Sequence, residues 1–447
     1  MRILLVMVAC LGASACVSTA PLKFTCGDRF ARHTSAYPDL PLVAEIHRDA
    51  RDFDAPDTQP VFFEMEGGAF DDGQPAMFVP TEASLALRDA VESADKATPG
   101  DDGESRIERP YGLLFLSGGG QWGAFGAGFL NAWHADKQAF PRITAITAIS
   151  TGAMQSLFVA AGEYDGLVDA YTITDQSQIA RGRGLVGLFR RGSLFDTASL
   201  RERIESTLCP PGEGGGRCPM LEAIAAEGSP HLLIGMVEAK SGNLLVTDVT
   251  AMVRDHYTQR DGSDRDLAQC VTGVAMASSA VPGQLSPVQI DGTTYVDGGV
   301  RSSVFAKLVG GSAMAARVAH KPKIWVIRNG PTIVAPDEGA KGDPALARVD
   351  ADPSVINVGK RSYSTIVNQN EVNSIALLRQ IYPREDMSLA TADGYLSLNP
   401  QAPRCQRDAG QEDRVFDPGF MACLVEWGRT KYVSPGWITL SPPQPGK

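Results

Sequence analysis

A glycine-rich turn between an apolar run and a run of small residues constrains this 447-residue chain more than any other feature. Residues 113–130 read LLFLSGGGQWGAFGAGFL, in which four apolar residues lead through Ser117 into three glycines and then into small residues at helical spacing. This pattern predicts a short buried strand that turns through glycine backbone into a helix. Unpaired N–H groups and the helix dipole favour negative charge at such a turn. We therefore expect the turn to hold an anion, either a cofactor phosphate or an oxyanion that forms during a reaction.

From residue 111 onward the sequence alternates between strand and helix patterns. The expected strands are residues 111–117, 143–149, 232–237, 244–249 and 324–328. The expected helices are residues 121–136, 151–162, 199–207, 267–279 and 361–382. Such alternation predicts an α/β fold, with a sheet flanked by helices.

The polar stretch 96–108, which contains Pro-Gly-Asp-Asp-Gly-Glu, is the best candidate for a domain boundary. Before it we expect strands at residues 60–65 and 76–80 and a helix at 82–93, and we expect the tail 400–447 to be irregular. The expected parts are a signal peptide (1–15), an N-terminal extension with linker (16–108), a core (109–330) and a helical and irregular C-terminal region packed on the core (331–447).

The N-terminus has the pattern of an export signal. Residues 3–11 are an apolar run too short to span a bilayer, and residues 13–15 (Ala-Ser-Ala) meet the small-residue cleavage pattern. With Cys16 directly after them, they resemble the bacterial lipobox, although Ala13 stands where that motif prefers Leu. The resemblance implies a lipid on Cys16 and an anchor to a membrane of the bacterial cell envelope, facing the periplasm. Ordinary signal cleavage, giving a secreted or periplasmic soluble protein, is the alternative.

Six cysteines remain after Cys10 in the signal and Cys16 are set aside. An even count in an exported chain suggests disulfides. The expected local pairs are Cys209 with Cys218 and Cys405 with Cys423, which leaves Cys26 and Cys270 as the remainder. A zinc site is the competing interpretation, and the sequence has neither a CxxC motif nor a nearby pair of histidines for it.

A second stretch, residues 148–152 (Ala-Ile-Ser-Thr-Gly), places Ser150 at a predicted strand-to-helix turn. A serine at this kind of turn is the nucleophile elbow, usually G-x-S-x-G, and Ala148 here replaces the first glycine. The same serine could instead be a helix N-cap. A third stretch, residues 295–300, runs from a short strand into Asp297-Gly-Gly. This is either a tight turn or a carboxylate held at a strand end.

Taken together and in this order, the three motifs resemble those of the patatin-like phospholipase family: G-G-G-x-[KR]-G, G-x-S-x-G and D-G-[GA]. The segment 277–283 (ASSAVPG) is similar to the Ala/Ser-rich, Pro-containing segment that precedes the family aspartate. The resemblance spans residues 111–305, which is under half of the chain.

The resemblance implies a three-layer α/β/α fold and a serine lipid acyl hydrolase that acts on membrane lipid or lipid-like esters without a cofactor or metal. Ser150 would be the nucleophile and Asp297 its base, in a dyad that needs no histidine. The oxyanion hole would be formed by the N–H groups of Gly118, Gly119 and Gly120.

Trp122 departs from the family pattern, because it stands where the glycine loop usually has Lys or Arg. The loop would then lack a cation, and either the substrate is less anionic or Trp122 lines an acyl groove. An inactive envelope lipoprotein that keeps the fold as a scaffold is one alternative function. A dinucleotide-binding protein is another, since GGGQWG also satisfies G-x-G-x-x-G, but no carboxylate stands at residues 147–150 to hold a ribose. The net charge of −11 argues against nucleic acid as a partner.

Overall fold

The computed structural model describes residues 21–37, 81–96, 110–184, 187–188, 192–212, 217–259, 262–311, 318, 320–332, 353–382, 386–396, 403–406 and 414–439. The expected signal peptide, Cys16, the strands expected at 60–65 and 76–80, and nearly all of the expected linker lie outside these residues.

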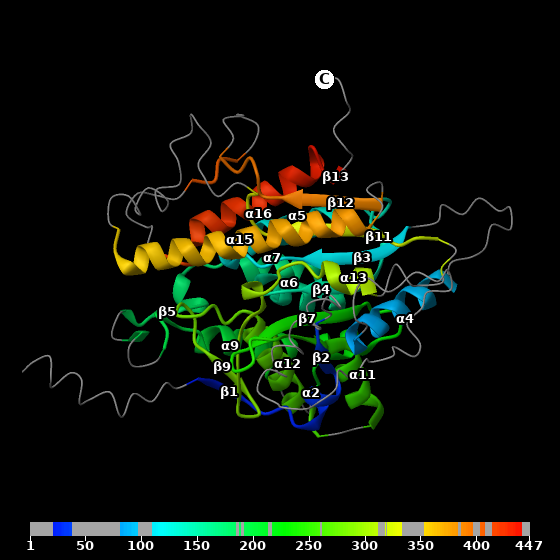
Figure 1. Ribbon diagram of the computed structural model, residues 1–447, viewed down its shortest axis with the longest axis horizontal. Coiled ribbons are helices and arrows are strands. Elements are labelled where there is room, and N and C mark those ends of the chain that lie inside the picture. Colours follow the sequence, from blue (N-terminus) through cyan, green and yellow to red (C-terminus); the bar gives the residue numbers. More distant parts are fainter. Residues whose placement is uncertain are drawn as a thin grey trace, which may run out of the picture.

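The centre of the molecule is a sheet whose described strands follow the order β1-β9-β10-β7-β4-β3-β11-β12-β13 (Figure 1). Its parallel centre consists of β3 (Tyr111–Leu116), β4 (Arg142–Ala148), β7 (His231–Glu238), β11 (Lys323–Arg328) and β12 (Met387–Thr391). Every residue of β3 is buried, as expected for a parallel strand that is covered on both faces.

The remaining strands lie mostly toward the two edges of the sheet. They are β1 (Leu22–Phe24), β2 (Thr34–Ala36), β8 (Leu244–Asp248), β9 (Val288–Ile290), β10 (Thr293–Asp297) and β13 (Ile438–Thr439). A separate two-stranded ribbon is formed by β5 (Arg181–Gly182) and β6 (Phe195–Asp196). Strands β7 and β8 pair antiparallel across the turn that joins them.

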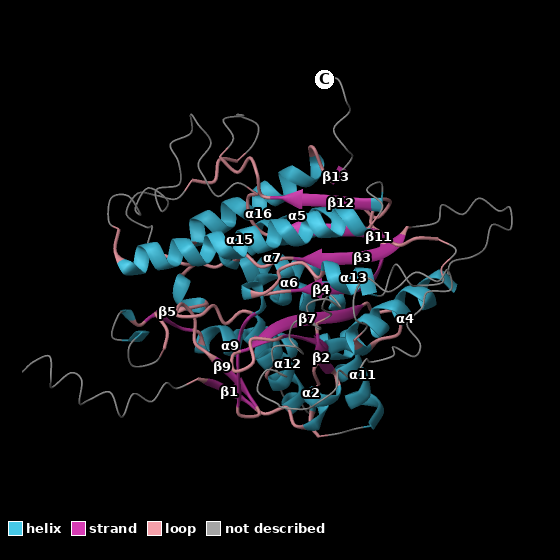
Figure 2. Ribbon diagram, in the orientation of Figure 1, coloured by secondary structure: helices cyan, strands magenta, loops and turns pink. Residues whose placement is uncertain are grey.

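Helices cover both faces of the sheet, so the molecule has three layers (Figure 2). One layer contains α5 (Gly123–Ala135), α6 (Thr151–Ala161), α7 (Tyr164–Tyr171), α9 (Ala198–Leu208), α10 (Pro219–Ala225), α11 (Val249–Gln259), α12 (Asp264–Ser278) and α16 (Pro418–Val433). The other contains α4 (Glu82–Lys96), α13 (Ala306–Gly311) and α15 (Val355–Ile381). The predicted three-layer α/β fold is confirmed.

The N-terminal residues that the structure describes join this architecture directly. Strand β1 pairs with β9, β2 pairs with β8, and the short helix α2 (Asp28–Arg32) places Phe30 in the core. In Figure 1 these blue elements lie at one edge of the sheet, and the orange and red C-terminal elements lie at the other.

Helix α16 corrects the expectation of an irregular tail after residue 400. Asp417 caps its N-terminus by accepting from the Phe420 N–H at 2.9 Å, and Pro418 occupies the first turn. The helix lies against α5 so closely that a Cβ on Gly428 would come within 2.1 Å of the Phe125 carbonyl oxygen. The two glycines in α16 obscured its helical pattern in the sequence. One of them, Gly428, is nevertheless what allows α16 to approach α5 so closely.

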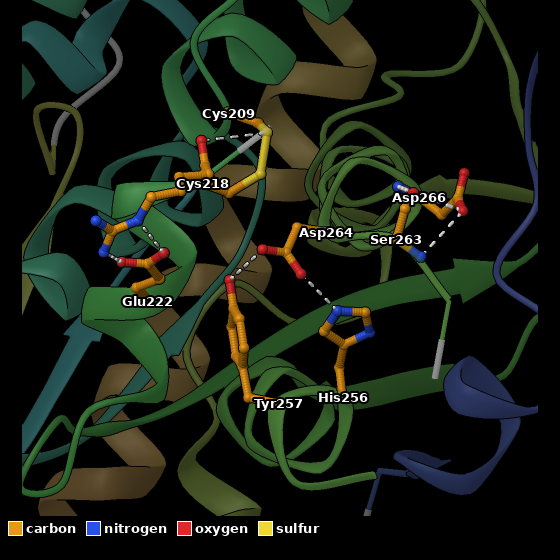
Figure 3. Close-up of a disulfide and its surroundings, with 9 residues drawn as sticks. Cys209, Cys218, Glu222, His256, Tyr257, Ser263, Asp264 and Asp266 are labelled. Atoms are coloured by element: carbon orange, nitrogen blue, oxygen red, sulfur yellow. Dashed lines mark hydrogen bonds and ion pairs between the residues drawn. A yellow bond between two sulfur atoms is a disulfide. The ribbon is translucent and has the colours of Figure 1, made fainter. Parts of the chain in front are cut away.

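Three disulfides join Cys26 to Cys270, Cys209 to Cys218 and Cys405 to Cys423, as the cysteine count and spacing suggested. Figure 3 shows the second of these next to a group in which His256 and Tyr257 both point toward Asp264. Among the described residues, no three potential metal ligands cluster, and no helix has the length and apolar character needed to cross a bilayer.

Candidate active site

Two adjacent strand–turn–helix units bring the first two sequence motifs together. Strands β3 and β4 pair in parallel, with Leu116 opposite Ala148, so the turns that follow them lie side by side at the carboxyl edge of the sheet. A Cβ placed on Gly118 would lie 3.3 Å from the Cβ of Ser150. The glycine loop therefore lies directly against the serine.

Ser150 has the backbone of a nucleophile elbow, with φ 54° and ψ −124° between β4 and α6. Positive φ is costly for a residue with a Cβ, and this strain is offset by the surrounding structure. The Ser150 N–H donates to Oγ of Ser278 at 2.9 Å, and only 6% of Ser150 is exposed. Ala148, which replaces the usual glycine, is fully buried in the sheet and leaves the turn intact.

Asp297 ends β10, and its carboxylate accepts a hydrogen bond from the Gly299 N–H at 2.7 Å and lies within interaction range of the Ser150 hydroxyl. It is 3% exposed. Burial raises its pKa to about 6, while the Ser150 hydroxyl and the Gly299 N–H oppose the rise because both favour the charged form. A carboxylate with this pKa can take a proton near neutral pH and release it again.

The glycine loop presents free N–H groups beside the serine. Gly119 and Gly120 have φ of 149° and 57° and are exposed, whereas Gly118 is buried. Within the part of the chain that the structure describes, the N–H groups of Gly118 and Gly119 donate to no protein acceptor. The loop thus offers donors next to the Ser150 hydroxyl, in the arrangement that an oxyanion hole requires.

Ser150 and Gly120 line a cavity of about 150 Å³ whose other lining side chains are mostly apolar. Met154, Leu157 and Phe158 line the cavity from one face of α6. This helix begins directly after the serine. The cavity therefore extends away from the Ser150 hydroxyl along α6. Leu208 of α9 and Phe416 of the C-terminal region close other sides.

Comparison with known proteins matches residues 114–309 to the model of the patatin-like phospholipases. This segment is thus similar to a patatin-like phospholipase domain. The match supports a hydrolase that acts on lipid esters. A search of the curated proteins found no match.

Among solved structures, the chain is similar to VipD from Legionella pneumophila at 14% identity and a TM-score of 0.32, covering 72% of this chain and 67% of that one. It is also similar to human GIVD cytosolic phospholipase A2, solved in complex with methyl gamma-linolenyl fluorophosphonate, at 12% identity and a TM-score of 0.28. That alignment covers 78% of this chain and 60% of the human one.

A buried polar network supports the glycine loop of the patatin-like domain from behind. Asn329, directly after β11, donates from its N–H to Oγ of Ser117 at 3.0 Å and from Nδ2 to the Ser117 carbonyl at 2.7 Å. Its side chain also forms a reciprocal amide pair with Gln155 of α6, at 2.9 and 3.0 Å. Both strand–turn–helix units are thus tied to β11.

A buried ion pair lies next to this network. Nε of Arg328 is 3.3 Å from Oε1 of Glu371 on α15, and both residues are at most 5% exposed. Burial raises the pKa of Glu371, while the Arg328 charge and a hydrogen bond with Ser117 oppose the rise. A guanidinium therefore lies near the glycine loop, although it comes from the end of β11, outside residues 114–309, and is paired with a carboxylate.

Helix α15, which lies outside the matched segment, covers Asp297 from the second helix layer. Val367 of α15 packs 3.5 Å from the Cβ position of Gly299. One turn earlier, Tyr363 lies close enough to Asp297 that the carboxylate charge adds to burial in raising the tyrosine pKa. This helix contributes to the water exclusion that raises the pKa of Asp297.

Trp122 is not among the residues that line the cavity, so the structure does not place it in an acyl groove. It packs edge-on against Tyr395 and Phe420, with ring centroids 4.8 and 5.1 Å apart. The sequence pattern predicted Ser150, Asp297 and the three glycines as site residues, and the structure brings all five positions together, while their chemical roles stay a prediction. The sequence pattern did not identify the supporting residues Ser278, Asn329 and Glu371. For Ser278 alone there was a signal, the Ala/Ser-rich segment 277–283.

None of the histidines that the structure describes lines the cavity. His134 stacks on Tyr164 with centroids 3.8 Å apart, and His256 pairs with Asp264 at 3.0 Å. His320 pairs with Asp95. These contacts account for three of the six histidines in the sequence, and none of them involves Ser150 or Asp297.

Proposed function

We propose that this protein is a serine acyl hydrolase that cleaves the carboxylic ester bond of a lipid through a Ser150–Asp297 dyad and an acyl-enzyme. One observation carries the proposal: Ser150, in the backbone of a nucleophile elbow, lies next to the Asp297 carboxylate and lines an apolar cavity. Burial of a hydrocarbon chain in such a cavity is favourable because apolar surface leaves water. The ester carbonyl at the end of that chain then lies between the serine and the glycine loop.

In the first half of the reaction, Asp297 takes the proton of the Ser150 hydroxyl while Oγ forms a bond to the ester carbonyl carbon. The carbonyl oxygen becomes an oxyanion, which the N–H groups of Gly118, Gly119 and Gly120 stabilise. Each such donor contributes roughly 10²–10³ in rate. Collapse of this intermediate breaks the ester C–O bond, and the leaving alcohol takes the proton from Asp297.

In the second half, Asp297 accepts a proton from water as the water oxygen attacks the acyl carbon on Ser150. The same donors stabilise the second oxyanion. The bond to Ser150 then breaks, the proton returns to Oγ, and a fatty acid leaves. A base with a pKa of about 6 is suited to both halves, because it is charged at neutral pH and still basic enough to accept a proton.

We also propose that the chain is exported and held at a membrane of the bacterial cell envelope, facing the periplasm, by a lipid on Cys16. The small residues before Cys16 and the three disulfides, which are typical of oxidising compartments, support this location. Labelled palmitate should enter the wild type and not the Cys16→Ala variant. Incorporation that persists in Cys16→Ala would contradict the lipid anchor.

Ester hydrolysis by matched variants tests the function. We expect the wild type to hydrolyse p-nitrophenyl octanoate and to release fatty acid from phosphatidylcholine vesicles. Ser150→Ala and Asp297→Asn should each lower kcat by about a thousandfold or more. Ser364→Ala, at an exposed serine on α15, is the control and should keep wild-type activity.

Each outcome has a distinct meaning. Ser150→Ala with wild-type activity would show that another group is the nucleophile, and fully active Asp297→Asn would remove the dyad alone. A wild type that hydrolyses no ester would favour the inactive scaffold.

A further inference from the structure

The residues at the start of α16 form one wall of the cavity beside Ser150. Val415, Phe416 and Met421 line it, and Phe416 and Met421 are buried. All three lie outside the segment 114–309 that matches the family model. This wall, residues 414–421, is therefore a contribution of the C-terminal region to the site.

The glycine loop holds this wall through the two residues that follow its third glycine. Oε1 of Gln121 accepts a hydrogen bond from the Asp417 N–H at 3.0 Å, and Gln121 is 5% exposed. Trp122 packs edge-on against Phe420. The loop residues thus contact Asp417 and Phe420, which lie between the cavity-lining residues Phe416 and Met421.

The wall is held from two further sides. The Phe416 N–H donates to Oε1 of Gln176 at 3.2 Å, close to Ile179, which lines the cavity. Helix α16 packs along α5, and the disulfide between Cys405 and Cys423 joins its second turn to the preceding segment. The wall is thus fixed relative to both the glycine loop and the far side of the cavity.

We propose that residues 414–421 are the specificity-determining wall for the acyl chain of the substrate, and that Gln121 and Trp122 are positioning residues that tie the oxyanion loop to this wall. The substrate class is an ester with an unbranched hydrocarbon chain, whose head group stays outside the cavity. The inference rests on the proposed function for its hydrolytic consequences. From Ser150 to Phe158, α6 offers about 12 Å of apolar length to that chain.

This arrangement gives Trp122 a role other than that of a loop cation. An aromatic ring at this position cannot stabilise an oxyanion by charge, but its contacts with Phe420 and Tyr395 fix the loop backbone whose N–H groups would do so. A cation beside the oxyanion would act directly on the reaction, whereas Trp122 acts through the position of the loop.

Hydrolysis of p-nitrophenyl acetate, octanoate and palmitate separates the two roles. In Phe416→Ala, kcat/KM for octanoate and palmitate should fall at least about tenfold through KM, because the wall no longer contacts the chain, and acetate should be unaffected. In Gln121→Met and Trp122→Ala, kcat should fall for all three esters, including acetate. Trp122→Phe should restore most of it. Val433→Ala, at an exposed position on α16, is the matched control.

Binding of a fluorescent fatty acid to the Ser150→Ala protein tests the wall without turnover. We expect the double variant Ser150→Ala/Phe416→Ala to bind at least about tenfold more weakly than Ser150→Ala alone. Equal binding, or an unchanged ester profile in Phe416→Ala, would overturn the inference. If the wild type hydrolyses no ester, the proposed function fails while this binding measurement still decides whether the wall holds the chain.

Discussion

The two strand–turn–helix units at the site meet the same geometric need in different ways. After β3, positive φ falls on Gly119 and Gly120, which have no side chain and expose their backbone. After β4, positive φ falls on Ser150, whose Cβ makes that conformation cost about 1–2 kcal/mol. One turn is adapted to present N–H groups, and the other accepts strain to present a hydroxyl. The comparison indicates that strain is retained where a side chain has a function.

The largest expected effect comes from adding a side chain to the first turn. In Gly119→Ala the new Cβ would lie 1.9 Å from the Asn329 carbonyl oxygen, at a φ that alanine rarely adopts. The combined strain and overpacking should lower the free energy of unfolding by about 4 kcal/mol and abolish ester hydrolysis.

Gly120→Ala is the matched control, because it also has positive φ but its Cβ would meet no neighbour within 4 Å. Its free energy of unfolding, measured in urea, should be about 1 kcal/mol lower than that of the wild type. Equal losses in the two variants would show that the close approach of Gly119 to Asn329 is unimportant.

The next effect concerns the carboxylate that faces the second turn. Since burial raises the pKa of Asp297 from 3.8 to about 6, the folded protein binds more protons than the unfolded chain between these pH values. The stability of the wild type therefore decreases as pH rises through this window. Asp297→Asn should be more stable than the wild type by about 3 kcal/mol at pH 7, and this gain should vanish below about pH 4.

The same pKa sets the pH dependence of activity. Hydrolysis by the wild type should fall as pH drops below about 6, because protonated Asp297 cannot accept the serine proton. Thermal unfolding and initial rates across pH 4 to 8 check both statements. An Asp297→Asn variant that is less stable than the wild type at pH 7 would contradict the raised pKa of this buried carboxylate.

The smallest expected effect isolates the strain at Ser150 itself. Ser150→Gly and Ser150→Ala both remove the hydroxyl, but only glycine relieves the cost of positive φ. Ser150→Gly should therefore be more stable than Ser150→Ala by about 1 kcal/mol in urea unfolding. A Ser150→Ala variant at least as stable as Ser150→Gly would show that the turn is not strained.

The sequence predicted the two turns well because their signals are local. Glycine spacing after β3 and the small residues around Ser150 determine the backbone within a few residues, and the observed strands and helices there begin and end within two residues of expectation. Asp297 could be assigned only because its motif resembles that of a known family. Its distance from Ser150 in the chain hides their contact from any local pattern.

What surrounds the turns could not be predicted, because it depends on contacts between distant segments. Asn329 reaches Ser117 across 212 residues, and Asp417 reaches Gln121 across 296. Polar residues such as Glu371 look like surface residues in the sequence, and only the fold shows that this one is buried beside Arg328. The presence of Trp122 in the glycine loop is likewise explained only by its packing against Tyr395 and Phe420, which are distant in the sequence.

The most direct test of the central claim is labelling of the purified protein with an alkyl fluorophosphonate, followed by mass spectrometry of its peptides. The dyad predicts a label on Ser150 in the wild type, formed faster as pH rises through about 6, and no label in Ser150→Ala. A label on another serine, a wild-type rate of labelling in Ser150→Ala, or a wild type that takes no label would contradict it.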